Sequence, residues 1–137
     1  DYAILPQGSA IPAKFDGKIL VPFAVESSLS GVQKTVGDQN ELWYKREFTI
    51  PETWKNKTIL LNFGAVDWKT DVWVNDVKVG SHTGGFTPFS FDITAALSGK
   101  GNNQLNSVFK MQPYPRINNM PTNSFRTDTQ YLCCLFV

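Results

Sequence analysis

Short stretches in which apolar and polar residues alternate recur along the first 110 residues, and turn-forming residues separate them. Alternation with a period of two is typical of a β-strand that buries one face. Roughly six or seven such strands at this spacing favour an all-β fold, either an antiparallel β-sandwich or a barrel, over a helical or α/β fold. The expected strands cover residues 19–25, 42–50, 59–65, 72–74, 77–79 and 89–93, and another begins near residue 103.

Two local signals add detail to this pattern. The dipeptide Asn75-Asp76 separates the stretches 72–74 and 77–79, and both of its residues tolerate the positive φ that a type I′ hairpin turn requires. We therefore predict a tight β-hairpin there. Pro22 lacks an amide hydrogen, so the strand over 19–25 is expected at a sheet edge.

The composition fits one domain with a substantial core and argues against several classes of partner. The chain has 137 residues, 42% of them hydrophobic, with thirteen basic residues against twelve acidic ones. A net charge of +1 provides no field to attract nucleic acid or an acidic membrane surface, and no apolar stretch approaches the roughly 18 residues of a transmembrane helix. The chain begins at Asp1, so a periplasmic or secreted location with a removed signal and a cytoplasmic location both stay open.

The pattern changes near Asn106, since residues 105–111 alternate only poorly. Residues 112–130 are polar, contain proline and show no period, and an apolar run follows over 131–137. We expect a β-sandwich over 1–112 and an ordered tail over 113–137, whose final run packs as a strand or against a neighbouring chain. The adjacent Cys133 and Cys134 lie in this run and are expected to act as small apolar residues, because neighbouring cysteines cannot join distant segments.

Four segments carry a more specific signal than the alternation does. They are LVPFAVES (20–27), LWYKREFTIP (42–51), NFGAVDWKTDVWVN (62–75) and GSHTGGFTPFSFDIT (80–94). Their order and spacing over about residues 18–105 resemble the amino-terminal domain of family 2 glycoside hydrolases, the group of β-galactosidases and β-glucuronidases. The resemblance implies a jelly roll, a galactose-binding-domain-like sandwich, which packs against an immunoglobulin-like domain and a (β/α)₈ barrel that carries both catalytic glutamates.

The sequence departs from the family pattern at two places. The hairpin tip is usually Asn-Gly in the family and is Asn75-Asp76 here. In place of a Trp- and Asp-rich segment, which in β-galactosidases can lend an acidic residue to the sugar pocket, residues 108–115 read VFKMQPYP, and Asp128 is the only later acid. A truncated or frame-shifted reading frame and a genuine divergent ending both explain this.

The acidic residues do not predict a catalytic centre. A retaining glycosidase needs two carboxyl groups about 5–5.5 Å apart. The dipeptide Asn40-Glu41 imitates the Asn-Glu pair of the family's acid/base, but it precedes a sandwich strand instead of ending a barrel strand, so we expect Glu41 to be a solvated loop residue. His82 is the only histidine, and we expect no catalytic residue, no metal site and no cofactor in this chain.

Trp68, Asp67 and His82 are the candidate sugar-binding residues. Trp68 lies beside Asp67 in an expected turn, where an exposed indole can stack on a sugar ring. His82 lies in a glycine-rich loop, where a hydrogen bond at an interface and a structural bond to the backbone are both open. Core packing is the alternative for each tryptophan, including Trp43 and Trp73.

A second group of residues is expected to have structural roles. Arg46 lies on the apolar face of its strand, where an unpaired charge would be very costly, so we expect an acidic partner among Asp67, Asp71 and Asp92. Gly84-Gly85 is expected to form a tight turn, because the Lys-Ser/Thr pair and the helix of a phosphate-binding loop do not follow it.

The resemblance implies that this chain is the non-catalytic N-terminal β-sandwich of a β-galactosidase-like enzyme of carbohydrate metabolism, inactive by itself, which braces the barrel and shapes its sugar pocket. The implied partners are a β-galactoside-type carbohydrate and the immunoglobulin-like and barrel domains of the parent enzyme, with no nucleic acid and no membrane. Two alternatives stay open. One is a free-standing carbohydrate-binding module, and the other is a ligand-free structural or interaction domain that self-associates through exposed apolar faces.

Overall fold

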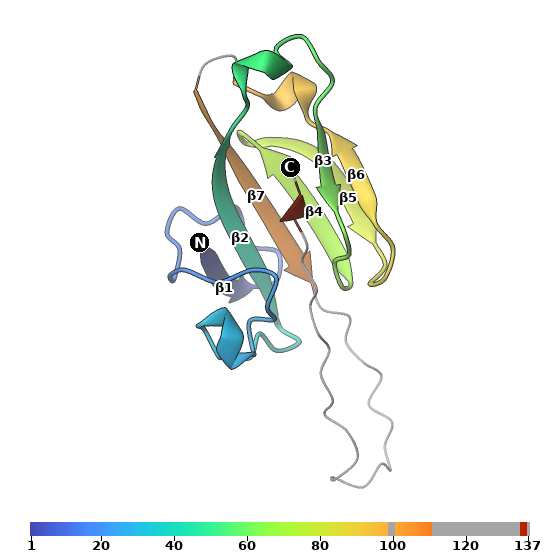
Figure 1. Ribbon diagram of the computed structural model, residues 1–137. Helices are drawn as coiled ribbons and strands as arrows, with labels where there is room; N and C mark the ends of the chain where they lie inside the picture. The colour runs from blue at the N-terminus through green and yellow to red at the C-terminus, as the bar shows by residue number, and fades with distance from the viewer. Residues whose placement is uncertain (99–100, 111–134, 137) are drawn as a thin grey trace, which may run out of the picture.

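Two antiparallel β-sheets pack against each other in the computed structural model, which describes residues 1–98 and 101–110 and the backbone of 135–136 (Figure 1). The larger sheet has five strands in the order β1-β2-β7-β4-β5, and the smaller has three in the order β6-β3-β8. This is the predicted antiparallel β-sandwich. The strands are β1 (Tyr2–Pro6), β2 (Asn40–Thr49), β3 (Leu60–Phe63), β4 (Lys69–Val74), β5 (Val77–Thr83), β6 (Phe89–Asp92), β7 (Asn102–Lys110) and β8 (Leu135–Phe136).

The helical content of the described ranges is limited to short 3₁₀ turns. They are η1 (Ser28–Ser30), η2 (Glu52–Trp54) and η3 (Thr94–Ala96). Within these ranges, no helix has the length and apolar character needed to reach across a bilayer.

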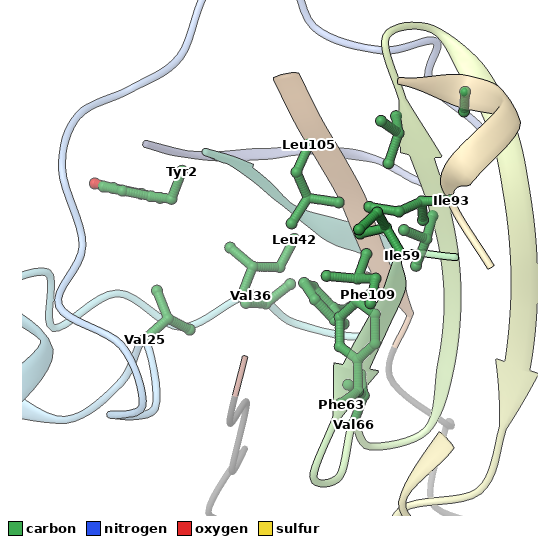
Figure 2. Packing of buried hydrophobic residues seen from close by; sticks show 14 residues of the cluster. Tyr2, Val25, Val36, Leu42, Ile59, Phe63, Val66, Ile93, Leu105 and Phe109 are labelled. Carbon is green, nitrogen blue, oxygen red and sulfur yellow. The ribbon is translucent and has the colours of Figure 1, made fainter. Parts of the chain in front are cut away.

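The main core lies between the two sheets and combines alternating apolar residues of the strands with residues of the connecting segments, among them Val25, Val36 and Ile93 (Figure 2). In β4, Val72 and Val74 are fully buried, because every second side chain points toward the smaller sheet. Leu61 and Phe63 of β3 meet them from that sheet, and the ring of Phe63 stacks on Phe89 at 4.7 Å. The period-two pattern therefore decides which residues of a strand enter the core.

The predicted hairpin joins β4 to β5. Asn75 and Asp76 have φ values of 48° and 66°, the left-handed conformation that a type I′ turn requires. The Asn75 side chain also donates to the Ala96 carbonyl at 2.8 Å and to Asn103 Oδ1 at 2.9 Å, and accepts from the Gln104 amide at 2.9 Å. Asn75 thus fixes the hairpin tip to β7 and η3.

Residues 19–25 do not form the edge strand that we predicted. The Leu20 amide bonds to the Ser30 carbonyl at 2.9 Å, so this segment pairs with the turn at η1 and lies outside both sheets. The edge beside β2 belongs to β1, which pairs with it from Tyr2↔Tyr44 to Pro6↔Asn40 and which the alternation did not indicate. Alternation indicates that a segment is extended, but it does not show which extended segment occupies the edge of a sheet.

A second apolar cluster covers the other side of the larger sheet, which we call the outer face. Trp43 and Val108 lie opposite each other on β2 and β7 and are buried there, with Ala3 beside them. Ile11 and Phe15 of the N-terminal segment pack on this cluster. On this face, Trp43 is therefore covered by the chain itself, and Trp73 is covered only in part. The partly buried members are Leu5, Ile11, Phe15 and Trp73.

Candidate functional site

The three candidate sugar-binding residues gather at one end of the sandwich, formed by residues 64–68 and 84–88, which we call the loop end. The Gly84 amide donates to the Trp68 carbonyl at 2.7 Å, which joins the two loops. A Cβ atom at Gly85 would lie 2.8 Å from Asp67 Oδ1, so a larger residue would have to displace the Asp67 side chain. His82, which precedes the second loop, lies 3.3 Å through Nε2 from Thr87 Oγ1.

The loop end exposes two large aromatic side chains. Phe86 is 95% exposed at the tip of its loop, and Trp68 is 37% exposed. Partial burial raises the pKa of Asp67, because removing a carboxylate from water disfavours its charged form. The strand β7 ends here too, since the Trp68 amide donates to the Lys110 carbonyl at 3.4 Å.

His82 belongs to β5 and lies partly buried beside β6. Its ring stacks on Phe89, with centroids 4.0 Å apart and the planes inclined by 14°. The stack and the contact with Thr87 fix the orientation of the imidazole. His82 therefore stabilises the loop that carries Phe86.

The expected burial and pairing of Arg46 are wrong. Arg46 is exposed, and none of the ion pairs among the described residues involves it. The strand pattern gives the face on which a side chain lies, but it does not say how far the opposite sheet extends over that face. Asp71 instead pairs with Lys78 at 2.8 Å, and Asp92 accepts from the Thr94 amide at 2.9 Å at the start of η3.

Glu41 is a buried residue of β2 and not the solvated loop acid that we expected. Only 1% of it is exposed. Its Oε1 accepts from the Trp43 indole at 3.0 Å, and its Oε2 accepts from the Gly8 amide at 3.1 Å and lies 3.3 Å from Lys110 Nζ. Both oxygens are thus engaged, and the carboxylate holds the N-terminal segment against the sheet.

A pocket opens on the outer face beside this carboxylate, and we call it the outer-face pocket. Its volume is about 330 Å³. The indoles of Trp43 and Trp73 stack at a centroid distance of 5.4 Å and line it together. Asp71 also lines the pocket, with 15% of its side chain exposed. The lining residues are Ser9, Ala10, Ile11, Glu41, Trp43, Asp71, Trp73, Val108 and Lys110.

Electrostatics keep Asp71 charged in this pocket. Partial burial raises its pKa, but the hydrogen bonds from Lys78 and Ser81 and the charges of Lys78 and Lys69 outweigh that effect, so the pKa of Asp71 is lowered overall. Both the Lys78 ammonium and the Ser81 hydroxyl bond to Oδ1.

Sequence reasoning missed this pocket, although part of its signal was present. Alternation along β2 and β4 already puts Glu41 with Trp43, and Asp71 with Trp73, on the side opposite the core. No sequence feature predicted that the N-terminal residues 9–11 lie beside this pocket. The pairing of β1 with β2, a long-range contact, brings them there.

Comparisons with known proteins agree with this fold. The family model described as "Glycosyl hydrolases family 2, sugar binding domain" matches residues 7–129. A β-glucuronidase of Paenibacillus borealis is 32% identical over 102 residues, which cover 69% of this chain and 17% of that protein. A β-galactosidase of Thermoanaerobacter pseudethanolicus is 44% identical over 52 residues, which cover 38% of this chain and 7% of that protein.

A comparison with solved structures also finds a β-glucuronidase. The β-glucuronidase of Ruminococcus gnavus is similar with a TM-score of 0.50 and 34% sequence identity, over 52% of this chain and 12% of that one. This chain therefore spans less than a fifth of the length of each of these relatives. Because the family model matches nearly the whole chain, the chain belongs to the sugar binding domain of the glycosyl hydrolases family 2.

Proposed function

We propose that this chain is the non-catalytic N-terminal domain of a β-glycosidase, and that its loop end packs on the catalytic barrel and shapes the rim of the sugar pocket. The observation that carries the proposal is the pair of exposed aromatic residues at one end of a family 2 domain, Phe86 and Trp68. Large apolar side chains that gather on a surface mark sites of interaction.

The chemistry of the loop end fits a rim beside a sugar. Asp67 offers a carboxylate and Trp68 offers part of an indole face, and such groups bind the hydroxyls and the C–H faces of sugars. His82 orients this loop through its stacked contact with Phe89. We therefore assign sugar contact to Asp67 and Trp68, and support to His82, Gly84 and Gly85.

The parent enzyme would hydrolyse a terminal β-glycoside with retention of configuration. We expected a β-galactosidase, and relatives of both kinds support the wider class: the Thermoanaerobacter protein is a β-galactosidase and the Paenibacillus protein a β-glucuronidase. Both oxygens of Glu41 are engaged within the domain, which favours catalytic acids outside it.

Reconstitution tests this proposal. The DNA that follows codon 137 is read in all three frames, and any barrel-coding part is expressed and mixed with the 137-residue chain. We expect turnover of a chromogenic β-galactoside or β-glucuronide only when both parts are present. Phe86→Ser should weaken reconstitution, whereas Val77→Ser should not, because Val77 is an exposed apolar residue on the hairpin at the other end of β4.

Two results would contradict the proposal. One is turnover by the purified chain alone that is lost in Glu41→Gln. The other is equal reconstitution by the Phe86→Ser variant and the unchanged chain.

A free-standing carbohydrate-binding module is the second candidate, and the outer-face pocket favours it. The pocket lies on a sheet surface, neither Phe86 nor Trp68 lines it, and it would keep its function without a barrel. A glycan-binding assay on the chain alone separates this candidate from a ligand-free interaction domain.

A further inference from the structure

The outer-face pocket has a volume within the range of small-ligand sites. Its volume of about 330 Å³ lies at the lower end of the range for such sites, roughly 300–1,000 Å³. That favours one ring-sized unit over an extended chain. Its walls come from β2, β4, β7 and the N-terminal segment, so segments distant in sequence meet there.

The apolar part of the pocket is aromatic. Trp43 is almost fully buried, and Trp73 stacks against it and is partly exposed. Lys78 Nζ lies 5.6 Å from the centroid of the Trp73 ring, which further fixes that indole. Rigid indoles of this kind contact the C–H faces of pyranose rings at low entropic cost.

The polar part of the pocket offers acceptors and donors for hydroxyl groups. Asp71 Oδ1 binds Lys78 and Ser81, while no residue in the described part of the chain bonds to Oδ2. The Lys110 ammonium carries three donor hydrogens, lies 3.3 Å from Glu41 Oε2 and is 30% exposed. A ligand that carries hydroxyl groups offers donors to the Asp71 carboxylate and acceptors to the Lys110 ammonium.

The charges of the pocket select a neutral ligand. Glu41 is balanced by Lys110, and Asp71 by Lys78. A uronate would bring a further carboxylate close to two existing ones, and like charges at short distance repel.

A buried amide on the same face adds unused hydrogen-bonding capacity. Asn106 lies opposite Trp73 on β7, two residues before Val108, and is 0% exposed. Neither its Oδ1 nor its Nδ2 has a partner among the described residues. Buried amides without partners are rare and costly, so a bridging water beneath the pocket is a suitable neighbour.

From these observations we propose that the outer-face pocket binds one neutral pyranose residue, at a site separate from the loop end. The proposal extends the function proposed above by a second carbohydrate contact on the opposite side of the larger sheet from the core. It does not depend on docking to a barrel, because Phe86 and Trp68 do not line this pocket.

The test is a titration of the 137-residue chain with methyl β-galactopyranoside, methyl β-glucopyranoside and methyl β-glucuronide, followed by the indole N–H signals in NMR. We expect the Trp43 and Trp73 signals to shift with the neutral sugars and much less with the glucuronide. Asp71→Asn should weaken binding by about tenfold, since it removes a charge-assisted hydrogen bond. Trp73→Phe is a second variant that preserves a ring at the site.

Trp54→Ala is the matched control, because it removes an indole that is 38% exposed in η2, does not line the outer-face pocket and should leave this affinity unchanged. The proposal is overturned if the unchanged chain gives no shift with any of the sugars. It is also overturned if Trp68→Ala abolishes binding while Asp71→Asn retains it, a result that would place the sugar at the loop end.

Discussion

At the scale of single residues, buried charges decide how the N-terminal segment is held. Glu41 joins that segment to β2 and β7, because its carboxylate meets the Gly8 amide, the Trp43 indole and the Lys110 ammonium. A buried carboxylate is stable only when its oxygens are bonded in this way. Glu26 is in a different situation, since its Oε2 is buried without a partner in the described part of the chain.

Replacing Glu41 should destabilise the domain. Glu41→Ala leaves the Trp43 indole and the Gly8 amide without an acceptor, and we expect the free energy of unfolding to fall by about 1–3 kcal/mol. Urea unfolding followed by tryptophan fluorescence measures this. Glu47→Ala is the matched control on the same strand, where the side chain is exposed and the change should stay within about 0.5 kcal/mol. Equal effects of the two variants would rule out the role assigned to Glu41.

Glu26 should make stability depend on pH. Partial burial raises its pKa above the ordinary value of 4.5, against smaller opposing effects of hydrogen bonds from its own and the Val36 backbone. Because the folded pKa exceeds the unfolded one, the folded state holds the proton longer. Stability is then lost as pH rises from 4.5 through the folded pKa.

Glu26→Gln should therefore be more stable than the unchanged chain at pH 7, and this advantage should vanish well below pH 4.5. Urea unfolding of both proteins across this pH range gives the difference. An advantage that stays constant with pH would show that the Glu26 charge is not its cause.

At the scale of elements, close packing between β5 and β6 depends on a missing side chain. Gly80 of β5 lies opposite Val72, where the register of the β4–β5 pair shifts. A Cβ atom there would lie 2.2 Å from Cε1 of Phe91 on β6. The two sheets can therefore approach along this edge only because position 80 is glycine.

Gly80→Ala should cost about 1–3 kcal/mol of unfolding free energy, because the Phe91 ring must leave its place in the packed edge. Thermal and urea unfolding both report this loss. Gly17→Ala is the control, since its new Cβ would meet only Tyr2 Cε1 at an ordinary 3.5 Å. A stable Gly80→Ala variant would mean that β5 and β6 separate easily.

At the scale of the whole molecule, the two faces of the larger sheet and the loop end have different structural roles. One face forms the main core with the smaller sheet, and the other carries the apolar cluster and the outer-face pocket. The loop end carries Phe86, which nothing in the described part of the chain covers. A domain that has lost its neighbours would present such a patch to other copies of itself.

The isolated chain should therefore associate weakly with itself through the loop end. Phe86→Ser should lower the concentration-dependent increase in mass seen by sedimentation or light scattering, with a stability change of at most about 0.5 kcal/mol. Val77→Ser, on the opposite end, is the control and should associate as the unchanged chain does. Association that survives Phe86→Ser would place the contact elsewhere.

Much of the framework follows from the sequence, because period-two alternation and turn chemistry act locally. The expected strands over 42–50, 59–65 and 89–93 correspond to β2, β3 and β6, and the Asn75-Asp76 turn has the positive φ values that it needs. The four family segments also sufficed to indicate the family, since their order and spacing reflect one shared fold.

Long-range contacts decided what local patterns could not. Tertiary structure assigned the edge of the larger sheet to β1, left Arg46 exposed, and buried Glu41 under the N-terminal segment. Alternation assigns a side chain to one face of a strand, but its depth depends on which distant segment covers that face. The outer-face pocket exists only where such a segment, residues 9–11, meets the sheet, so it could be seen only in the folded chain.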